Sequence, residues 1–505
     1  MDAFAALMDG FSYAIQPQTL MWGLIGCFLG TLVGVLPGIG PALTIALLLP
    51  LTYQVPATGM FVMFAGIYYG AAYGGSTTSI LVRTPGEAGS MMTALEGYQM
   101  ARRGRAGPAL ATAAIGSFVA GTIGTIALTF FAPWVVDVAL TFGPAEYFSL
   151  MVLALVAVTA VLGQSLTRGL LALSLGLLLG MVGIDLQTGQ ARFTFGHQPW
   201  LLDGISMTVA IVGIFAVGEA AYMAWQGRET KGGDVMKVTG KLMLSKADFK
   251  RSWKPWLRGS FYGFPIGAMP AGGSDVPTLL SYYTEKKLSK HPEEFGKGAI
   301  EGVAGPEAAN NAAAAGVLMP LLTLGIPTSA TAAVMLSAFQ GYGIQTGPGL
   351  FTSNSTLVWT LIASLYIGNV ILLVLNLPLV GMWVQLLRIP APWLWSGIIV
   401  IATLGVYGAT NSLYDVGLLY VFGLLGFLMR RFGFPAPPLI VGLILAPMAE
   451  QSMRQALTIS MGDWTTFVTR PISASLLAVA VLMMVVPALV RYRQRQAQAR
   501  TTTNP

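Results

Sequence analysis

The chain has 505 residues, of which 54% are hydrophobic and only 10% are charged, and its formal net charge is +7. Soluble domains carry about 25% charged residues, so this composition excludes an ordinary soluble domain and indicates an all-α membrane protein with many spans. The one cysteine, Cys27, excludes a disulfide framework. The positive charges lie in polar loops, where they report topology first.

The first long apolar segment, residues 20–53, is interrupted at its middle by Pro37, Gly38, Gly40 and Pro41. As one helix it would be about 50 Å long, which exceeds the roughly 30 Å hydrocarbon core of a bilayer. Folded at this interruption, it becomes two half-length helices. We therefore expect a re-entrant hairpin that returns to the side from which it entered.

The same pattern returns in the second half of the chain, shifted by 233 residues. The matched positions are Gly26, Gly30, Gly34, Pro37 and Gly40, which recur as Gly259, Gly263, Gly267, Pro270 and Gly273. Five matches in one register indicate an internal duplication. Paired Gly/Pro-interrupted segments in two halves of a membrane chain point to the binding site of a transporter.

Further elements follow each hairpin in the same order. In the first half, 60–82 ends at Thr84-Pro85-Gly86, and apolar spans follow at 109–131, 147–162, 170–182 and 205–224. In the second half, 300–324 ends at Gly325-Ile326-Pro327-Thr328-Ser329, and spans follow at 357–380, 394–404, 416–428, 439–445 and 476–489. We predict a first repeat at 1–226, a cytoplasmic linker at 227–257, a second repeat at 258–490 and a cytoplasmic tail at 491–505, with roughly 11–12 membrane spans in all.

The cations predict that the two repeats are inverted. Arg102, Arg103 and Arg105 follow the first break, whereas 341–349 after the second break has no cation. Conversely, 286–297 after the second hairpin carries four lysines, and 54–59 after the first hairpin carries none. Equivalent loops therefore lie on opposite faces, as in many secondary transporters. The same rule places the N-terminus outside and the C-terminus in the cytoplasm.

Sequence motifs for enzymatic chemistry are missing. There is no Walker A loop and no HExxH motif, and His197 and His291 fall in predicted loops. Gly272-Gly273-Ser274-Asp275 resembles part of an intramembrane aspartyl protease, but a second intramembrane aspartate in a fitting context is missing. We expect neither enzyme activity nor an organic cofactor.

The broken helices themselves form the candidate site. A half-helix N-terminus presents free N–H groups and a partial positive charge, which suits a carboxylate. The alternative explanation is purely structural: these small residues only allow close helix packing. Four breaks in symmetric pairs favour a site. The predicted substrate-binding residues are Pro37, Gly38, Gly40, Ser76, Thr77, Arg83, Thr84, Pro85, Gly86, Gly272, Gly273, Ser274, Pro327, Thr328 and Ser329.

Polar residues beside the second set of breaks are the candidate ligands of a coupling ion. Asn310, Asn311 and Asp275 supply oxygens for Na⁺, and a carboxyl group could instead carry a proton. We expect Glu301 to be interfacial. Arg83 has two readings that stay open: it pairs with a substrate carboxylate or with Glu87, or it extends to the cytoplasmic interface.

Four segments resemble one known family. They are GTLVGVLPGIGPALTIALLLPLTY, GIYYGAAYGGSTTSILVRTPGE, LEGYQMARRGRAGPAL and PEAANNAAAAGVLMPLLTLGIP, and they resemble the large membrane subunit of tripartite tricarboxylate transporters, the TctA family. The resemblance implies a bacterial inner-membrane carrier of organic carboxylates, driven by an ion gradient, with the outside N-terminus therefore in the periplasm. It also implies two partners, a small membrane subunit and a periplasmic solute-binding protein. Arg83 departs from the family pattern, where a small polar residue is expected, so substrate selectivity could differ from plain citrate uptake.

The sequence thus predicts cation-coupled uptake of organic di-/tricarboxylates, with Na⁺ or H⁺ as the coupling ion. The alternative is a membrane channel or scaffold subunit whose glycines only pack helices. A channel needs a continuous polar pore, whereas here the polar groups concentrate at two paired breaks. The segments 185–203 and 449–470, which we place outside, are the candidates for docking the binding protein.

Overall fold

The structure is a computed structural model. It describes residues 3–36, 38–162, 165–185, 187–196, 199–226, 236, 238, 242–270, 272–387 and 389–502, and the statements below refer to these. The predicted class is confirmed: the chain is an all-α membrane protein that spans the bilayer several times. Six described helices are long and apolar enough to cross a membrane, and five shorter apolar segments of 10–17 residues accompany them. The count of 11–12 spans stays a prediction, because the shorter segments have no assigned membrane position.

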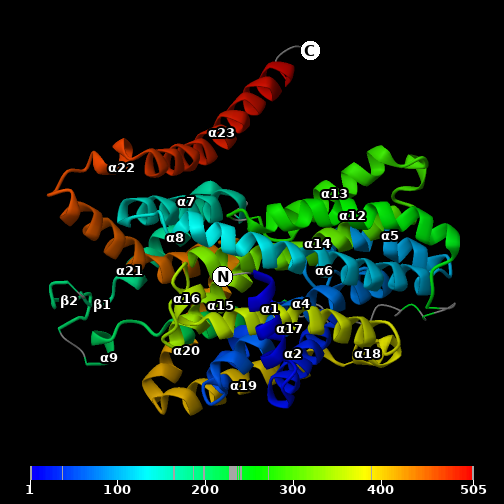
Figure 1. The fold of residues 1–505 in the computed structure, drawn as a ribbon, viewed down its shortest axis with the longest axis horizontal. Helices are drawn as coiled ribbons and strands as arrows, with labels where there is room; N and C mark the ends of the chain where they lie inside the picture. Colours follow the sequence, from blue (N-terminus) through cyan, green and yellow to red (C-terminus); the bar gives the residue numbers. More distant parts are fainter. Residues whose placement is uncertain are drawn as a thin grey trace. The chain divides into compact units, whose positions relative to one another are not determined.

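The chain forms two compact units (Figure 1). The first contains Met1–Leu140 and Ser206–Arg431, and the second contains Thr141–Ile205 and Phe432–Pro505. Each unit takes segments from both predicted repeats. The last part of the predicted linker is helical, because a helix begins at Lys246, and the predicted tail continues the last helix to Thr502.

The first unit holds most of the helices. Their bounds are α1 Ala3–Ala14, α2 Pro17–Val35, α3 Pro41–Leu48, α4 Ala57–Val82, α5 Met91–Arg102, α6 Ala106–Ala139, α10 Met207–Ile211, α11 Gly218–Trp225, α12 Lys246–Ala268, α13 Asp275–Leu288, α14 Glu301–Leu324, α15 Ala330–Gly341, α16 Leu350–Ser353, α17 Ser355–Asn376, α18 Val380–Leu386, α19 Ala391–Thr410 and α20 Leu413–Phe432. Short 3₁₀ segments are η1 Leu49–Thr52, η2 Ala88–Ser90 and η4 Pro292–Glu294, and η3 Val212–Val217 is a π-helix.

The first hairpin consists of α2 and α3. Its first helix runs parallel to α4, since Gly26, Gly30 and Gly34 meet residues of α4 in rising order. A Cβ at these glycines would lie 2.2–2.5 Å from backbone carbonyl oxygens of α4, so only glycine permits this approach. After α3 the chain returns to its starting level, because Gly59 near the start of α4 packs on Trp22 near the start of α2. The predicted return of the hairpin is therefore seen in the fold.

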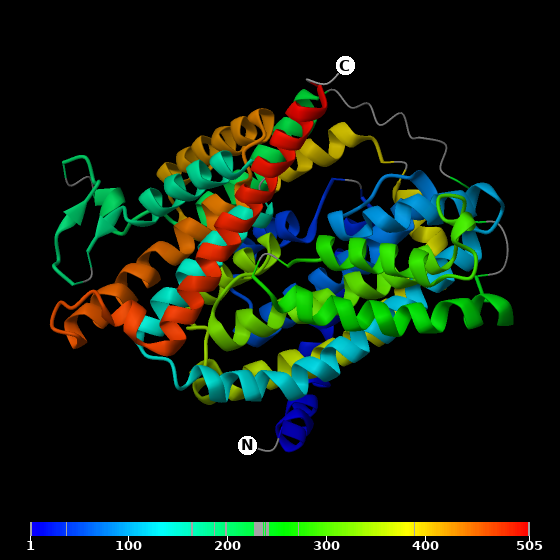
Figure 2. The ribbon, with the colours of Figure 1, turned by 90° about the horizontal axis from the view of Figure 1, so that it is seen from above.

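The second hairpin consists of α12 and α13 and follows the same plan. Gly259, Gly263 and Gly267 meet α14 in rising order, and a Cβ there would lie 2.3–2.5 Å from carbonyl oxygens. Arg251 in the first turns of α12 pairs with Glu301 at the start of α14, with Nε to Oε1 at 2.7 Å. Both ends of this hairpin thus lie at one level as well. The green ribbons of α12, α13 and α14 run side by side in Figure 2.

The two halves share more of their packing. In the first half, the hairpin helix α2 and the long helix α4 both pack against α17. In the second half, the corresponding helices α12 and α14 both pack against α6. The glycine contacts of the two hairpins also correspond. The glycines of the second hairpin lie 233 residues after those of the first, and the residues they meet on α14 lie 242 residues after those on α4. These correspondences agree with a duplication, while the opposite membrane orientation of the halves stays a prediction.

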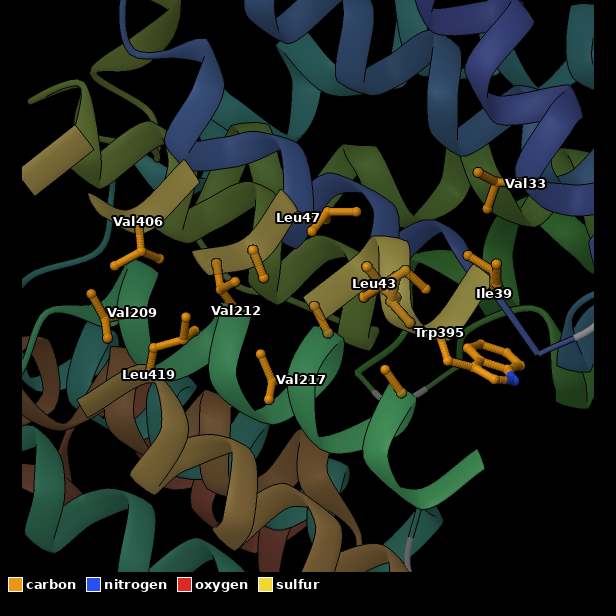
Figure 3. Close-up of a cluster of buried hydrophobic side chains, with 14 of the residues drawn as sticks. Val33, Ile39, Leu43, Leu47, Val209, Val212, Val217, Trp395, Val406 and Leu419 are labelled. Carbon is orange, nitrogen blue, oxygen red and sulfur yellow. The ribbon is translucent and has the colours of Figure 1, made fainter. Parts of the chain in front are cut away.

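An apolar cluster encloses the first hairpin. Leu43 and Leu47 of α3, with Ile39 just before it, pack against Val212 and Val217 of η3 (Figure 3). Residues of α19 and α20 complete the cluster, among them Trp395, Val406 and Leu419. These side chains are at most 9% exposed, so the hairpin is held by protein and not by lipid alone.

The second unit is built on two long helices and their neighbours. Its elements are α7 Pro144–Leu162, α8 Leu166–Gly180, β1 Gly183–Ile184, β2 Ala191–Arg192, α9 Pro199–Leu202, α21 Ala436–Ile459, α22 Thr466–Thr469 and α23 Pro471–Thr502. β1 and β2 pair antiparallel. α21 packs against α7 and α8, and α23 packs against α7. Gly176 of α8 gives close approach to α21, since a Cβ there would lie 2.0 Å from the carbonyl oxygen of Leu439.

Candidate functional site

Both predicted breaks end a helix in the same way. The C-cap of α4 is Arg83 with φ 61°, and the C-cap of α14 is Gly325 with φ 70°, so both lie in the left-handed region. This conformation suits Gly or Asn and strains a longer side chain, which is a physical reason for the small polar residue expected at position 83, where this chain has Arg83. The two caps are 242 residues apart, as are Pro85 and Pro327.

Each break packs on the end of the hairpin that precedes it. A Cβ at Gly86 would lie 2.0 Å from the carbonyl oxygen of Gly34 in the first hairpin. In the second half, Thr328 Oγ1 donates to the carbonyl oxygen of Gly267 at 3.0 Å. The local fold therefore brings each break to a hairpin tip, as the sequence predicts for a site.

Polar side chains from both halves meet around the first break and the second hairpin tip. Asn310 Nδ2 donates to Glu87 Oε1 at 2.7 Å. Gly89 separates two of the groups, since a Cβ there would lie 2.2 Å from Asn310 Oδ1 and 2.6 Å from Ser274 Oγ. Tyr68 of α4 lies near Ser329 and within electrostatic reach of Glu87 and Asp275. We name this set the central polar cluster: Tyr68, Glu87, Ser274, Asp275, Asn310 and Ser329.

The central polar cluster has a buried side and an open side. Asn310 is buried, while Glu87, Ser274 and Ser329 are partly buried and Asp275 is exposed. Ser329 also caps α15, because its side chain accepts from the backbone N–H of Ala332 at 3.2 Å. A ligand that reached this place would meet hydroxyl, amide and carboxylate groups together.

A second group of polar side chains lies on another face of α14. Glu307 Oε1 accepts from Thr93 Oγ1 at 2.5 Å. Asn311 Nδ2 donates to Ser117 Oγ at 2.7 Å and to the carbonyl oxygen of Glu307 at 3.0 Å. We name Thr93, Ser117, Glu307 and Asn311 the Glu307 cluster. Asn310 and Asn311 therefore separate, because consecutive helix residues point about 100° apart.

The remaining predicted site residues have other places. Arg83 and Thr84 are exposed, and the Arg83 guanidinium lies 5.8 Å from the ring centroid of Tyr98. Ser76 donates to the carbonyl oxygen of Tyr73 at 2.6 Å, and Thr77 is buried. Pro85 is partly buried in the first break, and Pro327 is buried in the second. Gly38 lies beside Met223, and a Cβ built at Gly40 would have no atom within 4 Å. Gly272 and Gly273 lie at the second hairpin tip. Pro37 lies outside the described residues.

Sequence reasoning left Tyr68, Glu87 and Thr93 out of the site. A signal for two of them exists in the chain: Tyr68 corresponds to Asn310, and Glu87 to Ser329, at the same 242-residue shift as the two prolines. Tyr68 of the first half thus lies near Ser329 in the second break, and Asn310 of the second half is bonded to Glu87 in the first break. The comparison of the hairpins alone, at 233 residues, does not reveal this second register.

Comparison with known proteins gives a consistent result. The model of the "Tripartite tricarboxylate transporter TctA family" matches residues 20–441. An Agrobacterium vitis protein described as an uncharacterized 52.8 kDa protein in the TAR-I ttuC' 3' region is 48% identical over 98% of both chains. A second Agrobacterium vitis protein, from the TAR-II ttuC' 3' region, is 46% identical over 47% of this chain and 98% of its own length. No solved structure matches. The chain therefore belongs to the tripartite tricarboxylate transporter TctA family.

Proposed function

We propose that this chain is the transmembrane subunit of a binding-protein-dependent carrier that imports organic di-/tricarboxylates with Na⁺ or H⁺. The observation that carries the proposal is the central polar cluster, in which Asn310 and Glu87 join the two halves beside the second hairpin tip. Binding groups contributed by broken helices of two related halves are typical of secondary transporters.

The chemistry of the cluster favours an anion together with a cation. The start of α15 offers backbone N–H groups and a partial positive charge to a carboxylate. Glu87 and Asp275 would repel the same carboxylate if both were ionised and uncompensated. A bound cation removes that repulsion. Coupled entry of the two ions therefore follows from the residues that the cluster contains.

The alternative is a channel or scaffold subunit. A channel would need polar groups along a continuous path, yet the tip of the first hairpin lies in the apolar cluster of Ile39, Leu43 and Trp395. This arrangement favours a carrier with a localised site. We propose no catalytic chemistry for the chain.

Family membership also supports the proposed partners, a small membrane subunit and a periplasmic solute-binding protein, in the bacterial inner membrane. Within the second unit, Arg454 pairs with Asp185 at 2.9 Å, and Arg192 pairs with Glu450 at 2.7 Å. These ion pairs hold the two predicted docking segments, 185–203 and 449–470, against each other. We propose that this joined surface receives the binding protein.

Uptake by membrane vesicles that contain the complete system tests the function. Labelled succinate and citrate are offered with an imposed Na⁺ gradient, with an imposed pH gradient, and with neither. We expect accumulation above the external concentration with one of the gradients, and only when the binding protein is added. Flux that merely equilibrates under all three conditions would identify a channel, and equal uptake without the soluble partner would contradict the tripartite assembly.

A further inference from the structure

The buried carboxylates of the first unit fall into two groups. In the first group the negative charge is compensated. Glu96 is enclosed by donors, with Oε2 accepting from the backbone N–H groups of Gly298 at 2.7 Å and Ala299 at 3.0 Å. Glu285 instead pairs with the guanidinium of Arg258. Both arrangements satisfy an ionised carboxylate, because hydrogen bonds and opposite charges favour the charged form.

Glu307 belongs to the second group. Its side chain is completely buried, and its single hydrogen bond is the one from Thr93 to Oε1. Glu307 Oε2 has no hydrogen-bond partner among the described residues. An ionised carboxylate is expensive in a membrane interior unless a partner compensates it, so this oxygen lacks the group that such burial requires.

Asn311 has the complementary deficiency. One of its Nδ2 hydrogens goes to the carbonyl oxygen of Glu307, which can only accept, so the orientation of the amide is determined by chemistry. The other goes to Ser117 Oγ. Asn311 Oδ1 has no hydrogen-bond partner among the described residues. Glu307 and Asn311 are four residues apart in α14, so their side chains project from the same face, one turn apart.

We propose that Glu307 is the binding site of a coupling proton. The proton binds Oε2 of Glu307, neutralises the carboxylate, and is donated as a hydrogen bond to Oδ1 of Asn311. One proton thus supplies the missing donor for both oxygens. Hard metal ions need more ligands, about six or more oxygens for Ca²⁺ and Mg²⁺, whereas a proton needs two. The inference rests on the proposed function and names the ion and the residue that carries it.

No cation on the neighbouring helices compensates Glu307 in the described part of the chain. α14 packs against α4, α5, α6, α12 and α13, and also against η2, α15 and α16, which have no charged residue. α4 has no charged residue, and the one charged residue of α6, Asp137, lies near its far end. On α12 the arginines are engaged by Glu301 and Glu285. The lysines of α12 and α13 and Arg102 of α5 are exposed, away from the buried Glu307. On α5 and α13 the nearby acidic groups are the satisfied Glu96 and the exposed Asp275. The charged group that interacts with Glu307 electrostatically is Glu87, another carboxylate.

This electrostatic interaction supplies the coupling. Glu87 belongs to the central polar cluster, where the substrate carboxylate is proposed to bind. A negative Glu307 adds to the negative field at Glu87 and opposes an anion there. Protonation of Glu307 removes this contribution, so proton and anion favour each other's binding, and the effect is reciprocal.

Infrared difference spectroscopy of the full-length protein in lipid vesicles tests proton binding directly, without any substrate. Spectra are compared between acidic and alkaline pH. We expect a protonated-carboxyl C=O band that titrates with pH, is lost in Glu307→Gln, and moves to higher frequency in Asn311→Ala because the O–H loses its acceptor. The matched control is Glu301→Gln, on the same helix and ion-paired with Arg251, which should retain the band. Glu87→Gln assigns a second carboxyl band if one is present.

A band that persists unchanged in Glu307→Gln would overturn the inference, as would its disappearance on adding Na⁺ at constant pH. In vesicles of the complete system, Glu307→Gln should lower succinate or citrate uptake driven by a pH gradient by about tenfold or more. Exchange of substrate across the membrane should continue, because the glutamine amide can donate to Asn311 Oδ1. If neither substrate moves in wild-type vesicles, the proposed function fails, while the infrared band still decides the proton site.

Discussion

The two hairpins have one backbone plan and two different surroundings. In both, three glycines bring the first helix onto the following long helix, and the chain returns to the level at which it began. The second helix of the first hairpin, α3, is mostly buried and its tip lies in an apolar cluster. The second helix of the other hairpin, α13, begins at the exposed Asp275 and buries a smaller part of its surface.

The two halves therefore share their helix packing and differ in their side-chain chemistry. At equivalent positions of the breaks the first half has Glu87 and the second has Ser329, and on the long helices the first half has Tyr68 and the second has Asn310. The carboxylate and the amide that joins it are thus brought together from opposite halves. The first hairpin tip lies among apolar side chains, and the second brings polar groups to the candidate site.

The largest expected effect concerns the membrane orientation of the two hairpins. A cysteine on one side of the membrane is either accessible to an impermeant reagent or not, so the result is all-or-none. Single cysteines replace Gln18 and Gln54 beside the first hairpin, and Lys254 and Lys287 beside the second. We expect an impermeant thiol reagent to label the first pair only from outside and the second pair only from inside. The native Cys27 is buried and serves as an unreactive background. Opposite labelling of two members of one pair would show a full crossing and refute the inverted arrangement.

The shared backbone plan predicts equal damage from equal substitutions. Gly30→Leu and Gly263→Leu each place a side chain against a carbonyl oxygen that would already lie about 2.5 Å from a Cβ. Overpacking commonly costs about 1–3 kcal/mol, and contact with backbone places both variants at or above the upper end. We expect little monodisperse protein in size-exclusion chromatography after mild heating. Gly397→Ala, where no atom lies within 4 Å of the added Cβ, is the control and should behave as wild type. Damage confined to one half would contradict the shared plan.

The diverged chemistry predicts unequal effects at the equivalent positions Asn310 and Tyr68. Asn310→Ala removes the donor to Glu87 and leaves a partly buried carboxylate without it, a loss of about 1–3 kcal/mol. Loss of this donor destabilises the ionised carboxylate, so apparent affinity for the coupling cation should rise by roughly 5- to 150-fold, while binding of the substrate anion, opposed by the uncompensated charge, should weaken. Tyr68→Phe removes only a hydroxyl contact and should cost less. Uptake at graded ion concentrations measures both, and a larger effect of Tyr68→Phe would reverse the assignment of chemistry to the two halves.

The smallest effects are expected where side-chain hydroxyls hold the two hairpin ends. Thr78 Oγ1 donates to the carbonyl oxygen of Val35 at 2.5 Å, and Thr328 Oγ1 donates to that of Gly267 at 3.0 Å. Thr78→Val and Thr328→Val keep the shape and remove one hydrogen bond each, at about 1 kcal/mol. Thermal unfolding should show a similar small decrease in Tm for both variants. A much larger loss in transport than in stability at Thr328 alone would mean that this hydroxyl also contacts the substrate.

Much of the architecture is determined by the sequence itself. A bilayer admits apolar helices of limited length, so composition and Gly/Pro interruptions were enough to predict the class, the hairpins and most of the later spans. The apolar run 109–131 lies within α6, and 357–380 largely coincides with α17. Six of the eight shifted glycines lie where a Cβ would be 2.2–2.5 Å from a carbonyl oxygen, whereas Gly40 and Gly273 have no atom within 4 Å of such a Cβ.

The grouping of the site residues was decided only by the tertiary structure. Side-chain direction in a helix changes by about 100° per residue, so the neighbouring Asn310 and Asn311 joined two different clusters although the sequence treats them as one pair. Glu87 and Glu307 lie 220 residues apart in the chain, and their proximity depends on the packing of α14 beside the first break. The types of residue at the candidate site are apparent in the sequence. Which of them would meet depended on long-range packing, because a hydrogen bond forms only where two helices bring its atoms together.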